Sequence, residues 1–60
     1  MDVVNEWDAR QLAAALRGNE PQRAADASAV LARMEAQEAL GLLRFTPQAR
    51  EVLREFMLAG

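Results

Sequence analysis

The chain has 60 residues, neither cysteine nor histidine, and a formal net charge of −2 from seven basic and nine acidic residues. A domain of this size buries only about 60% of the surface that its unfolded chain exposes, so it usually needs a supplement to its core. The absence of cysteine excludes disulfides, and the absence of histidine removes the commonest metal ligand. We therefore expect oligomerisation to supply the missing stability.

The charge and hydropathy patterns also narrow the function classes. All basic residues are arginines scattered along the chain, and the isoelectric point is near 4.9, which argues against general nucleic-acid binding. No basic start precedes an apolar run, and no stretch approaches the length of a membrane span. We expect a cytoplasmic protein without a membrane partner.

The first predicted helix covers residues 6–17. Asn5 is a suitable N-cap, Asp8 lies in the first turn, and Gly18 follows the last residue. At 100° per residue, Leu12 shares one face with alanines, whereas Trp7 lies on a different side. The helix therefore needs two neighbours.

The second predicted helix covers residues 21–40 and is the longest element. It starts after the break Gly18-Asn19-Glu20, with Pro21 in its first turn, and we expect Gly41 to end it. A stripe of alanines repeats at alternating spacings of four and three residues, which is the heptad spacing of a helix seam. The stripe consists of Ala25, Ala29, Ala32, Ala36 and Ala39.

Alanine lets two helix axes approach toward the lower end of the usual range of about 8–10 Å, so the stripe predicts a close helix neighbour. One interpretation places a second subunit on it. In the alternative, the helix 6–17 covers the alanines, and a second apolar face becomes the subunit contact. That second face consists of Val30, Leu31 and Met34.

The segment 42–45 is an unusually apolar connection, which we expect to be tucked against the core or covered by a second subunit. Thr46 and Pro47 then give a clear start signal for the third predicted helix, 47–58. This helix is amphipathic. Its packed face should contain Ala49, Val52, Leu53, Phe56 and Met57. No strand is predicted, and the expected fold is a single all-α domain, packed as a helical-bundle homodimer.

Catalytic, cofactor and metal sites are not expected. The only serine, Ser28, lies in the middle of a helix without a basic partner. Glu35 and Glu38 lack the histidine that helical di-metal sites add three residues after a glutamate. Glu38 either pairs with an arginine such as Arg44 or marks the solvent rim of the second apolar face.

Trp7 has two interpretations. It belongs to the core or dimer interface, or it forms with Val3 and Val4 an exposed anchor for another protein, since tryptophan is enriched at binding hot spots.

The sequence favours a small non-enzymatic regulator or adaptor, such as an inhibitor, an antitoxin-like protein or an assembly factor, which binds another protein as a homodimer. The first alternative is a DNA-binding transcription regulator that uses the third helix with Arg44, Arg50 and Arg54. The second alternative is a structural subunit of a larger assembly.

Overall fold

The computed structural model describes residues 1–59. Its elements, in chain order, are β1 (Asp2–Val4), α1 (Glu6–Arg17), α2 (Pro21–Ala39), β2 (Leu43–Phe45) and α3 (Pro47–Ala59). The chain is mostly helical, and the three predicted helices are confirmed with boundaries that differ by at most one residue. No helix in the described part of the chain is long and apolar enough to cross a membrane.

Two short strands correct the expectation of a purely helical chain. β1 and β2 pair in parallel, with Val4 opposite Phe45. Val4, Leu43 and Phe45 are buried, and Arg44 between the last two is exposed. Three residues are too few for alternation to be recognised in the sequence. The expected tucking of this connection is confirmed at Leu43 and Phe45, whereas Leu42 is 58% exposed.

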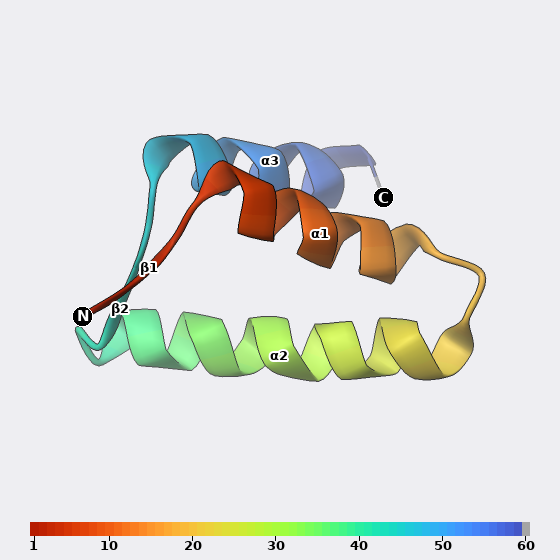
Figure 1. The fold of residues 1–60 in the computed structure, drawn as a ribbon, viewed down its shortest axis with the longest axis horizontal. Coiled ribbons are helices and arrows are strands. Elements are labelled where there is room, and N and C mark those ends of the chain that lie inside the picture. Colours follow the sequence, from red (N-terminus) through yellow and green to blue (C-terminus); the bar gives the residue numbers. More distant parts are fainter. Residues whose placement is uncertain (60) are drawn as a thin grey trace.

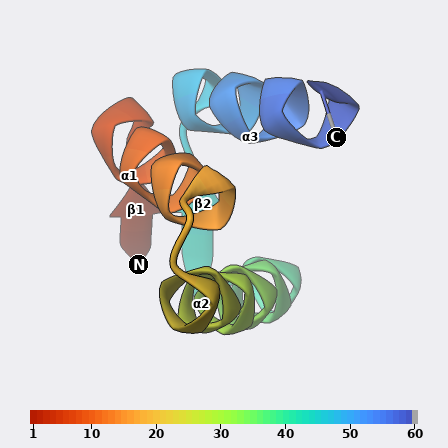
Figure 2. The ribbon, with the colours of Figure 1, turned by 90° about the vertical axis from the view of Figure 1, so that its right-hand side faces the viewer.

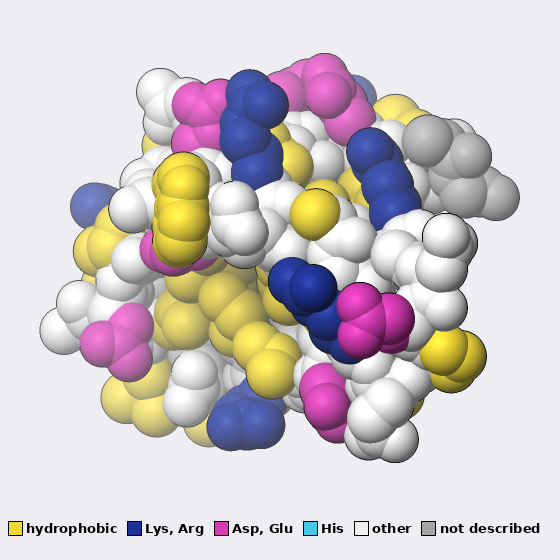
Figure 3. Space-filling model, turned by 45° about the vertical axis from the view of Figure 1, so that its right-hand side comes forward, with side chains coloured by type: hydrophobic (Ala, Val, Ile, Leu, Met, Phe, Trp, Pro, Cys, Tyr) yellow, Lys and Arg dark blue, Asp and Glu magenta, His cyan; other side chains and the backbone are white. Residues whose placement is uncertain are grey.

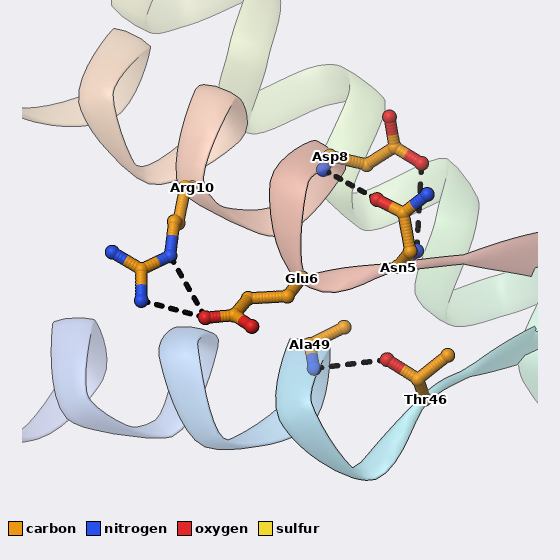
Figure 4. Close-up of polar contacts among 6 residues, drawn as sticks. All are labelled: Asn5, Glu6, Asp8, Arg10, Thr46 and Ala49. Atoms are coloured by element: carbon orange, nitrogen blue, oxygen red, sulfur yellow. Dashed lines mark hydrogen bonds and ion pairs between the residues drawn. The ribbon is translucent and has the colours of Figure 1, made fainter.

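The helix starts follow the capping chemistry of the sequence (Figure 4). The Asn5 side chain accepts a hydrogen bond of 2.9 Å from the Asp8 backbone N–H, and the Asp8 carboxylate accepts one from the Asn5 N–H. Thr46 Oγ1 accepts a bond of 3.1 Å from the Ala49 N–H at the start of α3. After α2, Gly41 has a φ of 78°, a conformation that favours glycine.

The helices form two layers (Figure 1). α1 and α3 lie above α2, and β2 crosses from the end of α2 to the start of α3. α1 packs on both other helices and makes its most extensive contact with α3. Viewed from the end in Figure 2, α1 lies to one side of the gap between α2 and α3.

The core is small and incompletely covered. It contains Val4, Ala9, Leu31, Leu43, Phe45, Ala49 and Leu53. Among the described residues, no large side chain is less than 2% exposed. Figure 3 shows hydrophobic side chains in a hollow on the left of the view, with arginine and acidic side chains around it.

Candidate interaction surfaces

The alanine face of α2 is exposed along its whole length. We use this name for Ala25, Ala29, Ala32, Ala36 and Ala39, each of which is exposed. Ala27 and Leu31, on the other side of the helix, are buried against the rest of the chain. In Figure 1 the lower side of α2 faces away from α1 and α3. The alternative in which α1 covers the alanine face is therefore wrong.

The second apolar face of α2 is used within the chain. Leu31 belongs to the core, and Met34 packs against it. Val30 is 38% exposed at the edge. Leu31 and Met34 thus serve packing within the chain, because α1 and β2 dock on the side of α2 where they lie.

Large exposed side chains continue the alanine face at the end of α2. Leu40 is 74% exposed, Leu42 is 58% exposed and Met1 is 80% exposed. The backbone N–H of Asp2 donates a hydrogen bond of 3.3 Å to the Leu42 carbonyl, which brings the start of the chain to this end of α2. The exposed apolar surface of α2 therefore includes large side chains at the end of the helix as well as the alanines along it.

A second open surface is the groove between α2 and α3, which we call the α2–α3 groove. It has a volume of about 470 Å³. α2 lines it with Leu31, Glu35 and Glu38, β2 with Phe45, and α3 with Arg50, Leu53, Arg54, Met57 and Leu58. The sequence pattern missed the groove because it placed Met57 on the packed face of its helix, where the structure leaves it 57% exposed. The available signal was the run of three large apolar residues at 56–58, which is more than a single helical stripe needs.

One ion pair crosses this groove. Arg50 Nη2 on α3 donates a hydrogen bond to Glu38 Oε2 on α2. The Arg50 guanidinium also lies over the Phe45 ring, 5.8 Å from its centroid. Glu38 therefore pairs with an arginine, as the first of its two interpretations states, but this arginine is Arg50 and not Arg44. Arg44 lies on the strand before α3, outside the groove lining.

The predicted anchor around Trp7 is only partly exposed. Trp7 is 66% exposed and Val3 is 49% exposed, whereas Val4 is 5% exposed and belongs to the core. Trp7 is therefore not a core residue of this chain, and Val4 is not part of an exposed anchor. The parallel pairing with β2 explains the difference, because alternate residues of a strand point to opposite faces.

The three arginines of the DNA-binding alternative do not form one basic surface. Arg50 is held by Glu38, and Arg54 lines the same groove, beside Glu35 and Glu38. Arg44 is exposed on β2, in register with Val3. Both arginines of α3 therefore lie near acidic residues, which reduce the positive charge of this surface.

In residues 1–59, no group of three acidic side chains is placed to hold a metal ion. Ser28 is exposed on α2.

Comparison with known proteins assigns no family. No protein-family model, curated protein or solved structure gives a significant match to the chain.

Proposed function

We propose that this chain is a small non-enzymatic regulator or adaptor that binds another protein as a helical homodimer, with the alanine face of α2 as the dimer contact. The observation that carries the proposal is the exposure of all five alanines, none of which is covered by the chain's own helices. Exposed Leu40 extends the same side of α2 with a larger apolar group. Burial of this surface is favourable at roughly 25 cal/mol per Å² of apolar area.

An antiparallel pairing suits the alanine face. The stripe is nearly symmetric about Ala32, so a two-fold axis there brings Ala25 opposite the partner's Ala39 and Ala29 within one residue of the partner's Ala36. The helix dipoles then oppose each other favourably. Because alanine allows close backbone approach, the contact would be narrow and sensitive to any larger side chain at its centre.

The incompletely buried core supports this proposal, because a subunit contact would cover apolar surface that the chain leaves exposed. No large side chain in the described part of the chain is fully buried, and eight large hydrophobic residues are exposed. A dimer covers part of this surface and leaves the rest to a larger target protein. The regulator would then act by occluding a surface of that target.

Light scattering of Ala32→Leu and Ala14→Leu tests the dimer. Both variants add the same atoms to an exposed helical alanine, but only Ala32 lies in the alanine face. We expect wild type and Ala14→Leu to share one oligomeric mass, at least that of a dimer, and Ala32→Leu to have a smaller mass, with unchanged helicity by circular dichroism. A monomeric wild type, or an unchanged mass for Ala32→Leu, would refute the contact.

The two alternative functions, a structural subunit and a DNA-binding regulator, predict different results for the same protein samples. A structural subunit would form a polymer instead of a discrete dimer. A DNA-binding regulator would bind mixed-sequence DNA at low salt with an affinity that falls steeply as salt rises. The pairing of Arg50 with Glu38 does not favour this second outcome.

A further inference from the structure

The α2–α3 groove is an apolar surface separate from the alanine face. The two surfaces have no residue in common. The interior of the groove contains Leu31, Phe45 and Leu53, and Met57 and Leu58 line it while remaining 57% and 77% exposed. α1 packs against α2 and α3 from the other side, as Figure 2 shows, so no helix of the described chain covers the groove.

The two sides of the groove carry opposite charges. Glu35 lies on the α2 side and Arg54 on the α3 side, and neither makes an ion pair with another described residue. Glu38 and Arg50, in contrast, already compensate each other across the groove. One acidic and one basic group are thus left beside an apolar surface, each on a different helix.

We infer that a second copy of this chain occupies the groove, in a two-fold contact that places α2 of each copy against α3 of the other. A two-fold axis at the groove mouth exchanges the two sides. Glu35 of one copy then faces Arg54 of the other, and the reverse pair forms by symmetry. The same docking covers Met57 and Leu58 of both copies.

The self-complementary charges are the reason for choosing a second copy as the occupant. An unrelated partner would need its own acidic group opposite Arg54 and its own basic group opposite Glu35, whereas a second copy supplies both without further assumption. Such charge complementarity fixes the register of an interface. The contact goes beyond the proposed function, because it is a second subunit contact that shares no residue with the alanine face.

A charge-reversal cycle tests the groove contact. We would measure sedimentation equilibrium at low ionic strength, where ion pairs are least screened. The samples are wild type, Arg54→Glu, Glu35→Arg and the double variant, with Arg44→Glu as an exposed charge reversal outside the groove. We expect each single variant to weaken the contact by about tenfold or more, and the double variant to recover most of the loss. Arg44→Glu should behave as wild type.

The same experiment in an Ala32→Leu background separates the two proposals. If both hold, wild type is larger than a dimer, and Ala32→Leu and Arg54→Glu each reduce it to a dimer through the remaining contact. If only the alanine-face contact exists, Arg54→Glu keeps the wild-type dimer mass, and the groove inference is overturned. If only the groove contact exists, Ala32→Leu leaves a dimer that Arg54→Glu converts to a monomer. Failure of the double variant to recover association also overturns the groove inference, and circular dichroism verifies that each variant is folded.

Discussion

Glu38 of α2 and Arg50 of α3 form an ion pair across the groove that separates these helices. The Glu38 side chain is 29% exposed and the Arg50 side chain is 63% exposed, so water screens much of the attraction. The arginine also covers the ring of Phe45, a core residue. The pair therefore connects the two layers of the fold at a point where apolar packing is thin.

Glu38→Gln should lower the free energy of unfolding by up to about 1 kcal/mol, because partly exposed ion pairs contribute little in water. In a chain of this size, about 1 kcal/mol corresponds to a shift of roughly 4–8 °C in Tm. Thermal melts by circular dichroism measure the loss, which should shrink at high salt. Glu55→Gln is the control, since Glu55 makes no ion pair with a described residue. Equal losses for the two variants would contradict a role for the pair.

Asn5→Ala should destabilise the chain by about 1 kcal/mol, the typical effect of removing an N-cap side chain. The variant loses the acceptor for the Asp8 N–H and one half of the capping box. Urea unfolding measures the change. Asn19→Ala is the matched control, because the N-cap of α2 is Glu20, which forms no side-chain capping bond, and Asn19 precedes it in an exposed turn. A loss at Asn19 as large as that at Asn5 would show that the capping box contributes nothing specific.

Ala49→Leu should destabilise the monomer by about 1–3 kcal/mol, the usual cost of overpacking a filled core. Ala49 on α3 and Ala9 on α1 are both 0% exposed and lie in the same core cluster. Thermal denaturation compares this variant with Ala14→Leu, which places the same side chain at an exposed position. Similar melting temperatures for the two variants would mean that α1 and α3 do not approach closely.

Arg33→Gln should strengthen an antiparallel alanine-face dimer by about twofold, because like charges on neighbouring helix positions cost a few tenths of a kcal/mol. Arg33 is exposed next to Ala32, so the two copies of Arg33 lie close together beside the two-fold axis. In a parallel dimer they lie on opposite sides of the seam. Sedimentation equilibrium in the Arg54→Glu background isolates this contact. Arg23→Gln is the control, as Arg23 lies on another side of α2, and equal affinities would favour the parallel arrangement.

The helices were predictable because their signals are local. Asn5 and Thr46 accept backbone hydrogen bonds within three residues of themselves, and Gly41 takes a positive φ directly after α2. The strands were not predictable, because β1 and β2 are three residues long and are brought together by a crossover that contains α1 and α2. Their burial depends on partners that lie far apart in the chain.

Some features of the candidate surfaces were likewise predictable from the sequence, and others were not. The sequence alone determined that five alanines share one side of a helix, because helical periodicity places them there. It also determined that the core would be thin, since thirteen of the 60 residues are alanine.

Only the tertiary structure decided which alanines are covered. The buried ones are Ala9, Ala13, Ala27 and Ala49, and the whole alanine face of α2 is exposed. The same packing left the groove between α2 and α3 open and paired Glu38 with Arg50 instead of Arg44. These outcomes depend on how α1 docks against the two other helices, and such docking reflects the sum of many weak long-range contacts that no local sequence pattern records.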